Sequence, residues 1–235
     1  TTADVKAANI EYFNNHTSFD VVMSNKILSS AETWKKITLP MLGKHNVLNC
    51  LASISIAIEM GISENSIRNT LNNFKGIKRR FESKGVTNNG IKIIDDYGHH
   101  PVEITYALSS GRILASKNKL IAIFQPHRYS RLKDLFDEFC QCFNNADYVF
   151  ITDVYAAGES EIENFNKETL AAGISDFGHN NVSIINNENE ICDKIHSIAK
   201  ANDVVIFLGA GSITKWSETI VHQLNNSGLK NEKIF

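Results

Sequence analysis

The sequence has no long apolar run and no strong excess of charge of either sign. No hydrophobic stretch approaches the roughly 18 residues that a membrane-spanning helix needs, and the first residues show no signal-peptide pattern. With a formal net charge of −2, the chain has no general attraction to nucleic acid or to anionic membranes. We therefore predict a cytoplasmic protein that binds neither nucleic acid nor membrane.

Cysteine is sparse and forms no metal or redox motif. The four cysteines are Cys50, Cys140, Cys142 and Cys192. Because none of them belongs to a C-x-x-C or zinc pattern, we predict buried, reduced thiols and no metal site in this chain. A Walker-type phosphate loop is missing as well, since Gly43-Lys44 is followed by His45. The chain starts at Thr1, which fits a trimmed chain or a fragment of a longer protein.

Short β-branched apolar runs alternate with amphipathic stretches from Ile91 onward. The runs are Ile91–Ile94, Leu120–Phe124, Tyr148–Thr152, Val182–Ile185 and Val204–Leu208. Such runs are typical of strands buried on both faces, and their alternation with helices predicts an α/β fold with a mostly parallel, doubly wound sheet. One helix is expected between Leu132 and Phe143 with Ser130 as its N-cap, and another from Glu188 to about Lys200.

The first 80 residues show no repeating strand–helix pattern. The elements predicted there are strands at Phe19–Met23 and Lys36–Leu39, an apolar helix at Asn46–Met60 ended by Gly61, and a helix at Ser63–Phe74 capped by Ser63. We expect them to be the end of a separate domain. Because Gly, Thr and Asn cluster at Lys84–Asn89, the predicted domains are residues 1–84 and 85–228.

Residues that can carry chemistry follow four of the predicted strands. They lie in the segments Asp95–Pro101, Gln125–Arg131, Asp153–Glu159 and Gly209–Thr214. In open parallel sheets, ligands bind beyond the carboxyl ends of the strands, which share one edge. The four segments therefore predict a single site at that edge.

The first of these segments is rich in donors and acceptors. A carboxylate such as Asp95 or Asp96 can accept from ribose hydroxyls, and the Tyr97 ring can lie against a purine. Alternatively, one of the two aspartates caps the following helix and the histidines lie on the surface. Joint metal ligation by His99 and His100 is disfavoured, because neighbouring side chains diverge.

Two arginines, Arg128 and Arg131, flank a predicted helix start. Arginine forks match carboxylate and phosphate groups, and a helix N-terminus adds partial positive charge, so this pattern predicts an anionic ligand. The alternative is that both arginines are solvated and pair with Asp134 or Glu138.

Three weaker signals also concern nucleotides. Lys78-Arg79-Arg80 is a basic triplet before the predicted boundary, which favours either a phosphate contact or a solvated surface. Asn46 and Asn49 share a helix face and can read an adenine edge, although the pattern alone favours an N-cap at Asn46 and an ordinary exposed Asn49. Gly209-Ala210-Gly211 has the first two glycines of G-x-G-x-x-G, but Thr214 replaces the third, so it is a weak dinucleotide signal.

Six motifs occur in the order found in the Mur ligases, a family that the sequence resembles from about Phe19 to Leu224. They are Gly43–Asn49, Lys78–Glu82, Asp95–Pro101, Phe124–Arg131, Asp153–Glu159 and Leu208–Ile213. The forms at Asp95–Pro101 and Gln125–Arg131 resemble the branch that joins L-alanine to UDP-N-acetylmuramate.

The resemblance implies a three-domain, cytoplasmic, ATP-dependent amide-forming ligase of peptidoglycan synthesis that works through an acyl phosphate. Residues 1–84 match the tail of its central ATP-binding domain, and residues 85–228 match its Rossmann-like last domain. The implied cofactors are ATP and Mg²⁺, with the P-loop and main metal ligands in a part that this sequence lacks. We therefore expect the chain alone to be inactive.

The resemblance also implies roles for individual residues. Asn46 and Asn49 resemble adenine readers, Arg80 the arginine that reaches the ATP phosphates, and Asp96 with Tyr97 the ribose and adenine contacts, although Asp95 is an equal candidate for ribose. His99, His127, Arg128 and Arg131 resemble the residues that meet the amino acid and the muramoyl carboxylate, and His99, Arg128 and Arg131 are the catalytic candidates. The alternatives are a non-catalytic nucleotide- or anion-binding module and an NAD-type dehydrogenase domain.

Overall fold

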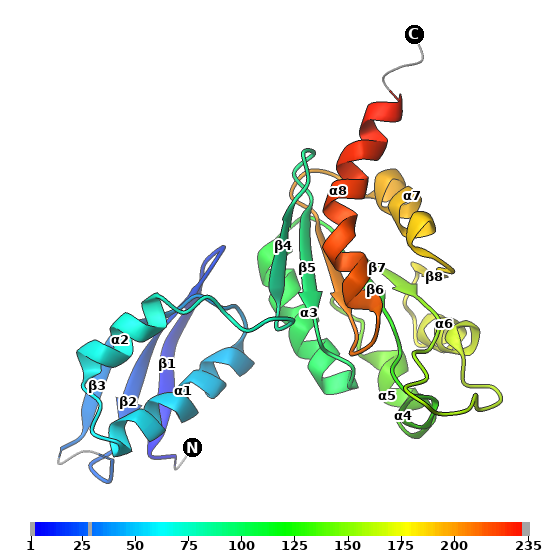
Figure 1. The fold of residues 1–235 in the computed structure, drawn as a ribbon. Coiled ribbons are helices and arrows are strands. Elements are labelled where there is room, and N and C mark those ends of the chain that lie inside the picture. The colour runs from blue at the N-terminus through cyan, green and yellow to red at the C-terminus, as the bar shows by residue number, and fades with distance from the viewer. Residues whose placement is uncertain (1–2, 28–29, 232–235) are drawn as a thin grey trace. The chain divides into compact units, whose positions relative to one another are not determined.

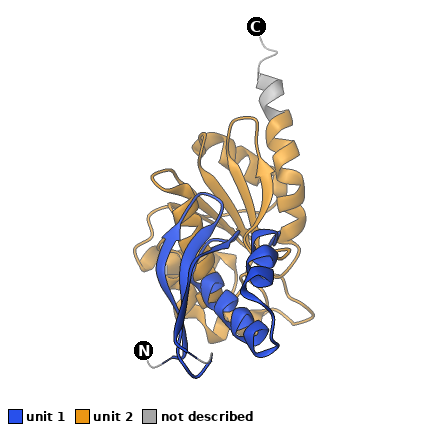
Figure 2. Cartoon of the chain, turned by 90° about the vertical axis from the view of Figure 1, so that its left-hand side faces the viewer, with its two compact units in different colours: residues 1–76 blue, residues 77–235 orange. Residues whose placement is uncertain are grey.

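The computed structural model describes residues 3–27 and 30–231, and divides the chain into two compact units, residues 1–76 and 77–235 (Figure 2). The division falls at Gly76 and Ile77, ahead of the predicted boundary at Lys84–Asn89. Lys84 lies within a strand of the second unit, and the residues after it form the turn to the next strand. The cluster of Gly, Thr and Asn therefore marks a hairpin and not a linker.

Unit 1, residues 1–76, is an antiparallel sheet with two helices (Figure 1). Its elements are β1 (Val5–Tyr12), β2 (Thr17–Met23), β3 (Glu32–Leu39), α1 (Lys44–Glu59) and α2 (Glu64–Asn72). The sheet order is β1-β2-β3. Phe19 and Val21 of β2 pack with Ile54 of α1 and Ile67 of α2 in the core of this unit. As predicted, Ser63 caps α2, accepting a hydrogen bond from the Ser66 amide.

Unit 2, residues 77–235, contains a six-stranded sheet with the order β4-β5-β9-β6-β7-β8. The strands are β4 (Glu82–Val86), β5 (Lys92–Asp96), β6 (Leu120–Phe124), β7 (Tyr148–Ile151), β8 (Val182–Ile184) and β9 (Val204–Leu208). The helices are α3 (Pro101–Ala115), α4 (Tyr129–Asp134), α5 (Phe136–Gln141), α6 (Lys167–Asp176), α7 (Glu188–Ile198) and α8 (Ile213–Asn231). From β5 to β8 all neighbouring strands are parallel, whereas β4 pairs antiparallel with β5. The predicted mostly parallel sheet is confirmed.

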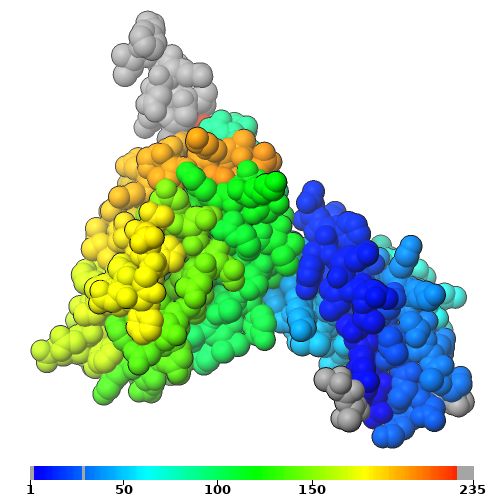
Figure 3. Space-filling model, turned by 180° about the vertical axis from the view of Figure 1, so that it is seen from behind, coloured from blue at the N-terminus to red at the C-terminus, as the bar shows by residue number. Residues whose placement is uncertain are grey.

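Helices cover both faces of this sheet, so the predicted doubly wound arrangement is also confirmed. On one face, Phe124 of β6 packs with residues of α3, α4, α5 and α6, among them Leu108 and Phe139. On the other face, Phe207 of β9 packs with residues of α7 and α8, among them Ile195 and Ile220. Figure 3 shows unit 2 from behind, coloured by residue number. The α5 and α6 helices lie against each other on one face of the sheet.

The helix predicted between Leu132 and Phe143 is two short helices, α4 and α5, which meet at Leu135 with φ −123° and ψ 29°. The prediction that Ser130 caps it was wrong. The N-cap residue is Arg128, whose side chain makes no capping hydrogen bond. Ser130 lies inside the first turn of α4.

The prediction of buried, reduced thiols is confirmed. All four cysteines are free and buried. Burial raises the pKa of Cys50, Cys140 and Cys192 to about 11, so these thiols stay protonated and unreactive at neutral pH. No helix within residues 3–27 and 30–231 is long and apolar enough to cross a membrane.

Candidate functional site

The four segments that follow strands in unit 2 meet at one edge of the sheet, as predicted. β9 lies between β5 and β6, so the segment after β9 bonds to both neighbours: the Gln125 amide donates to Leu208 O at 2.9 Å, and the Gly209 amide donates to Asp96 O at 3.1 Å. The Tyr155 amide donates to Pro126 O at 2.8 Å. Backbone hydrogen bonds therefore fix the segments after β5, β6, β7 and β9 against one another.

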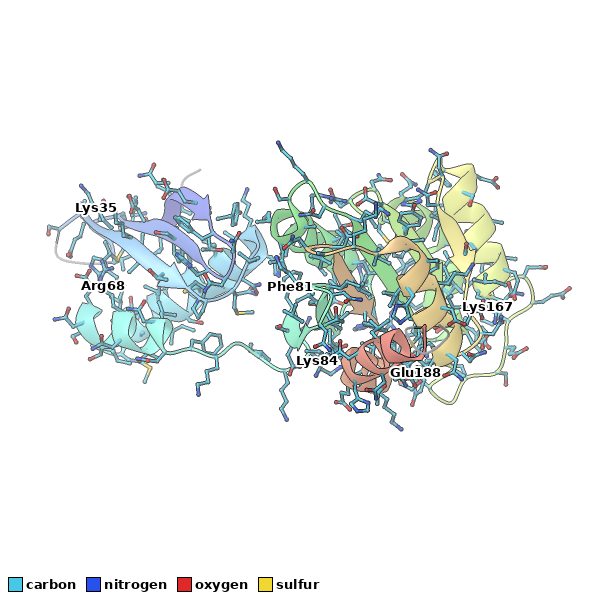
Figure 4. The ribbon with its side chains drawn as sticks, turned by 90° about the horizontal axis from the view of Figure 1, so that it is seen from above. Lys35, Arg68, Phe81, Lys84, Lys167 and Glu188 are labelled. Carbon is cyan, nitrogen blue, oxygen red and sulfur yellow. The ribbon has the colours of Figure 1, made fainter. Side chains whose placement is uncertain are left out.

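Asp96 organises the backbone at the end of β5. Its Oδ1 accepts from the Gly98 amide at 2.7 Å, and its Oδ2 accepts from the Phe81 amide at 2.8 Å. Its side chain is almost fully buried, and burial raises its pKa to about 6. Both oxygens of Asp96 are thus engaged by the protein, and a ribose contact for it stays a prediction. Phe81, labelled in Figure 4, lies directly before β4.

Asp95 is fully buried and pairs with groups of its own unit. Its Oδ2 accepts from Thr214 Oγ1 at 2.8 Å and lies 3.5 Å from Arg79 Nε. Burial raises the pKa of Asp95, and the Thr214 hydrogen bond and Arg79 oppose that shift. A buried carboxyl group engaged by Thr214 and Arg79 has a structural role, which disfavours Asp95 as the ribose contact.

Neither aspartate caps α3, so that alternative was wrong. The N-cap of α3 is His100, whose Nδ1 accepts from the Val102 amide at 3.3 Å, and Pro101 occupies the first helical position. A proline there is favourable because the first helical N–H has no intrahelical partner. His100 is therefore accounted for by helix capping.

Tyr97 lies beneath two guanidinium groups. The Arg79 group is 4.7 Å and the Arg80 group 5.6 Å from its ring centroid. Arg79 also donates from Nη2 to Gly209 O at 2.6 Å, whereas the further contact of Arg80 is a 3.7 Å ion pair with Glu103, and its side chain stays 46% exposed. Of the basic triplet, Arg79 is thus a structural residue, and Arg80 is the one with a guanidinium available to a ligand.

His99 has a defined tautomer in its neutral form. Its Nδ1 lies 3.0 Å from Tyr97 O and 3.3 Å from Glu103 Oε2. Both neighbours are acceptors, so Nδ1 carries the proton and Nε2 keeps its lone pair. Glu103 also accepts from the His99 amide at 3.1 Å, which fixes the residue at both ends.

His127 has the opposite tautomer. Its Nδ1 lies 3.2 Å from Arg131 Nη1, which can only donate, so the Nδ1 accepts and Nε2–H is free to donate. Its ring stacks on Tyr155 at 5.4 Å and lies 5.7 Å from the ring of His99. Burial, then the charges of Arg131, His99 and Arg128, hold the pKa of His127 below its usual 6.5. At neutral pH it is a neutral donor beside two arginines.

Arg128 and Arg131 do not make the ion pairs that the structural alternative requires. Across residues 3–27 and 30–231, neither of them pairs with Asp134 or Glu138. Arg131 folds back to donate from Nη1 to His127 O at 2.9 Å, and Arg128 Nη1 lies 3.9 Å from Glu159 Oε1. Arg128 is half exposed, so its guanidinium can reach a ligand.

The expected contribution of a helix N-terminus to anion binding is wrong at this position. The α4 helix is only six residues long, and Glu159 occupies its N-terminus. Glu159 Oε2 accepts from the Ser130 amide at 3.0 Å, and Oε1 accepts from Ser130 Oγ at 2.7 Å. The positive charge at this edge therefore comes from the arginine side chains.

The turn after β9 is filled by the protein's own side chains. Gln125 Oε1 accepts from the Ile213 amide at 3.0 Å, and its Nε2 donates to Ser212 Oγ at 3.2 Å. A Cβ on Gly211 would lie 2.5 Å from both Gln125 Oε1 and Tyr155 Cγ. The amides that would cradle a pyrophosphate in a dinucleotide site are therefore approached by Gln125 and Tyr155, which disfavours the dehydrogenase interpretation.

Asn46 and Asn49 lie on α1 in unit 1, which begins at Lys44 with Gly43 as its N-cap residue. An N-cap at Asn46 is thus wrong. The Asn46 amide is buried and donates to Leu42 O at 2.8 Å, whereas Asn49 is exposed. The two predicted adenine readers differ, and Asn49 is the one whose amide faces away from the core.

An acidic cavity lies beside the segment that follows β7 in unit 2. It has a volume of about 800 Å³ and is lined by Tyr129, Asp153, Glu161, Glu163, Lys167 and Glu168, among others. It includes Asp153 of the predicted segment Asp153–Glu159, but none of the residues to which a ligand contact was individually assigned, and its negative lining does not suit an anionic ligand. In the part of the chain that the structure describes, no group of three or more His, Cys, Asp and Glu residues is placed to hold a metal ion.

Several residues that build this edge had no individual role predicted from the sequence. They are Glu103, Gln125, Tyr155, Glu159 and Thr214, whereas Arg79 was expected only as part of a basic triplet that contacts phosphate or solvent. Gln125, Tyr155, Glu159 and Thr214 stand in the segments after strands, so the strand-end rule was a signal for them. The contact of Glu103 with His99 had a local signal in the i, i+4 spacing.

Comparison with known proteins agrees with this architecture. The sequence model described as "Mur ligase, glutamate ligase domain" matches residues 79–211. The UDP-N-acetylmuramate–L-alanine ligase of Rhodospirillum rubrum is 47% identical over 222 residues, which are 94% of this chain and 46% of that protein.

Two solved structures of Thermotoga maritima proteins share the fold. The UDP-N-acetylmuramate–alanine ligase matches with a TM-score of 0.78 at 24% identity, over 97% of this chain and 47% of that one. The MurF ligase, solved in complex with ADP, matches with a TM-score of 0.65 at 16% identity, over 97% and 47%. The chain spans about half the length of the relatives it matches. Because the family match covers more than half of its residues, the chain belongs to the Mur ligase family.

Proposed function

We propose that this chain is the C-terminal part of an ATP-dependent ligase that joins L-alanine to UDP-N-acetylmuramate. The observation that carries the proposal is the group of two histidines and two arginines at the carboxyl ends of the strands. In this group, His127 is contacted by both Arg131 and Tyr155. The 47% identical relative bears the name of that activity, but its other half has no counterpart in this sequence. The activity therefore belongs to the complete gene product.

The proposed reaction places negative charge where these residues lie. In an acyl-phosphate route, ATP phosphorylates the carboxylate of UDP-N-acetylmuramate, the amine of alanine attacks the carbonyl carbon, and phosphate leaves with the bonding electron pair. Arg128 and Arg131 are suited to the carboxylate of alanine or to the developing oxyanion, because arginine forks bind such groups through charge-assisted hydrogen bonds. His127 Nε2–H adds a neutral donor on the same side.

His99 is the candidate for proton transfer. Free alanine carries an ammonium group, which must lose one proton before nitrogen can attack. His99 Nε2 keeps its lone pair while Nδ1–H is held by Tyr97 O and Glu103, so the ring can accept that proton and become an imidazolium stabilised by the Glu103 carboxylate. A role for Glu103 in orienting His99 follows from the same contacts.

Contacts to ATP are proposed on each unit by itself. Asn49 is suited to the adenine edge, with Asn46 supporting α1 from within, and Arg80 is suited to the phosphates because it is partly exposed and carries only a long ion pair. Tyr97 is proposed as the adenine contact and Asp96 as a ribose contact through lone pairs beyond those that the Gly98 and Phe81 amides use.

Mg²⁺ and a cytoplasmic location remain parts of the proposal. The residues from 3 to 27 and 30 to 231 offer no cluster that fits a metal ion, so no step is assigned to a metal bound by this chain. The location is proposed because both substrates, ATP and the UDP-linked peptidoglycan precursor, are found in the cytoplasm.

The test is a product assay. The complete gene product should convert UDP-N-acetylmuramate, L-alanine and ATP into UDP-N-acetylmuramoyl-L-alanine, ADP and phosphate, detected by mass spectrometry. The 235-residue chain alone should give no product, since its sequence has no P-loop to cradle the β- and γ-phosphates. Product from the chain alone, at a rate that survives repeated purification, would show that the phosphates are held by other means.

The alternatives predict different results. A dehydrogenase-type domain should quench NADH fluorescence on titration, and we expect no saturable quenching because Gln125 and Tyr155 approach the turn after β9. A non-catalytic binding module predicts nucleotide binding by the complete gene product without amide formation.

A further inference from the structure

The segment Asp153–Glu159, to which the proposed function assigns no chemical step, contacts the segment Gln125–Arg131, which carries Arg128 and Arg131. Tyr155 donates from its amide to Pro126 O at 2.8 Å, and the Arg128 amide donates to Tyr155 O at 2.9 Å. These bonds form a parallel bridge between His127 and Tyr155, whose rings also stack. The His127 backbone is thereby held from both sides.

A tight turn then brings Glu159 to the same loop. Ala157 and Gly158 have φ of 51° and 90°, and the Glu159 amide donates to Ala156 O at 3.1 Å. Positive φ at both central residues is what a type I′ turn requires, and Gly158 adopts it without steric cost. The turn directs the Glu159 carboxylate back toward α4.

Glu159 supplies the cap that α4 lacks. Arg128, the N-cap residue, makes no side-chain capping bond. Instead, Glu159, which lies 29 positions after Ser130, accepts from both the amide and the hydroxyl of Ser130. A carboxylate on the first-turn amides satisfies donors that have no intrahelical partner. The Ser130 amide and hydroxyl hold the pKa of Glu159 below its usual value, so it is ionised at neutral pH.

Arg128 is held in a conformation that it would not adopt by itself. Its φ is 72° and its ψ 132°, a region that residues with a Cβ rarely occupy. Such a conformation persists only where the surroundings fix the residues on both sides. The Tyr155 bridge fixes one side of Arg128 and the Glu159 cap fixes the other.

The far end of the segment is anchored as well. Lys167, labelled in Figure 4, is buried at the start of α6, and its Nζ lies 2.7 Å from Asp153 Oδ1 and 2.7 Å from Asn186 Oδ1. The segment is therefore tied to α6 at its first residue and to α4 at its last. It can therefore hold the segment Gln125–Arg131 in a fixed conformation.

We propose that Glu159 is a positioning residue, which sets the backbone of Arg128 and the start of α4 so that Arg128 and Arg131 point at the anionic ligand. The identity of that ligand, the alanine carboxylate or the oxyanion formed from it, rests on the proposed function. The conformational part stands on the contacts of Glu159 alone.

The test compares Glu159→Ala, Glu159→Gln and the control Glu163→Gln, an exposed glutamate of the same loop. In NMR spectra of the chain, the parent should show a strong intraresidue amide–Hα NOE at Arg128, which marks positive φ. Glu159→Ala should lose this NOE and shift the Ser130 amide signal. Glu159→Gln should keep the NOE, because its carboxamide oxygen still accepts from Ser130, and Glu163→Gln should match the parent.

In the complete gene product, Glu159→Ala should lower kcat/KM for alanine by about tenfold, the effect of one misplaced charge-assisted hydrogen bond, and Glu159→Gln should restore most of it. An unchanged NOE at Arg128 in Glu159→Ala overturns the proposal, and so does an altered NOE with unchanged alanine kinetics, which leaves Glu159 a purely structural role. A parent that forms no amide refutes the proposed function instead, and the NMR comparison then decides the conformational claim by itself.

Discussion

Arg79 donates a 2.6 Å hydrogen bond from Nη2 to the carbonyl oxygen of Gly209, 130 positions along the chain. The same guanidinium lies 3.5 Å from the fully buried Asp95 carboxylate and over the Tyr97 ring. It thereby joins the residues before β4 to the end of β5 and to the turn after β9. The neighbouring Arg80 shares only the contact with the Tyr97 ring and bonds to neither Gly209 nor Asp95, so the two arginines should respond differently to mutation.

Arg79→Ala should lower the free energy of unfolding of the chain by about 3–5 kcal/mol, because it leaves the Asp95 carboxylate buried without its cation. Arg80→Ala should change it by no more than about 1 kcal/mol, since a partly exposed ion pair with Glu103 contributes little. Urea denaturation followed by circular dichroism measures both. Equal losses for the two variants would contradict the division of the triplet into a structural and an available arginine.

Kinetic measurements on the same pair add a second distinction. In the complete gene product, Arg80→Ala should reduce kcat with ATP while the protein remains folded, since charge that develops on the transferring phosphoryl group loses its counter-charge. Normal ATP kinetics in Arg80→Ala would remove Arg80 from the phosphate site.

The pKa of His127 should lie below 6.5, and Arg131→Gln should raise it without bringing it to that value. Burial is the largest cause of the lowering, and Arg131 is the first of the charges that add to it. Arg128→Gln should raise the pKa less, because Arg128 is the weaker of the two arginine contributions. Titration of the His127 ring signals by NMR measures these values, and a larger rise in Arg128→Gln than in Arg131→Gln would contradict the geometry at Nδ1.

The same pKa has a consequence for stability. Because the folded state disfavours the protonated imidazole, the unfolded chain binds a proton more readily below pH 6.5. The contribution of His127 to stability is therefore full above pH 6.5 and is lost as the pH falls through its lowered folded-state pKa. His127→Gln should remove this part of the pH dependence of the unfolding free energy.

Much of the sheet in unit 2 could be predicted from the sequence, because strands buried on both faces leave continuous apolar runs. β4 could not, since Glu82–Val86 contains charged and glycine residues and pairs along only one side, at the sheet edge. The turn that follows β4 is rich in Gly, Thr and Asn, as linkers are. The boundary was therefore predicted at Lys84–Asn89 and not at Gly76 and Ile77. β1 was missed for a similar reason, because most of its residues are only half buried.

The site was predictable to the level of segments but not of individual contacts. The strand-end rule brought together the segments that contain His99, His127 and Arg131, and the structure joins them. That Glu159 and not Ser130 caps α4 depends on a contact across 29 positions, which local spacing does not encode. Likewise, nothing in the Asp95-Asp96 pair distinguishes the aspartate bound to Arg79 from the one bound to two backbone amides.

Asn49→Ala should raise the KM for ATP of the complete gene product more than it changes kcat. The side chain is exposed on α1, and its proposed contact is with the adenine, a part of ATP that does not react, so that loss of such uniform binding should appear in KM. Its stability should equal that of the parent. Asn46→Ala should also destabilise the protein, by about 1–3 kcal/mol, because it removes the buried hydrogen bond from the Asn46 amide to Leu42 O. A fall in kcat at constant KM for ATP in Asn49→Ala would exclude adenine recognition.

Arg131→Lys should lower kcat/KM for alanine by about tenfold or more in the complete gene product, since one charge-assisted hydrogen bond contributes roughly 1.5–3 kcal/mol. Lysine keeps the charge but lacks the planar guanidinium fork. In the parent, Nη1 of Arg131 bonds to both His127 O and His127 Nδ1. Because these bonds lie within one loop at the open edge of the sheet, the melting temperature should stay close to that of the parent.

Arg112→Lys provides the matched control for this substitution. Arg112 lies near the opposite end of the strands, where its guanidinium donates to Asn145 O, Asn118 O and Asp147 Oδ2 and secures the start of β6 and β7. Its replacement should therefore lower the melting temperature and leave alanine kinetics unchanged, the reverse of the pattern expected for Arg131. If Arg131→Lys instead shows a lowered melting temperature with normal alanine kinetics, its bonds to His127 serve the loop alone, and Arg131 does not belong to the substrate site.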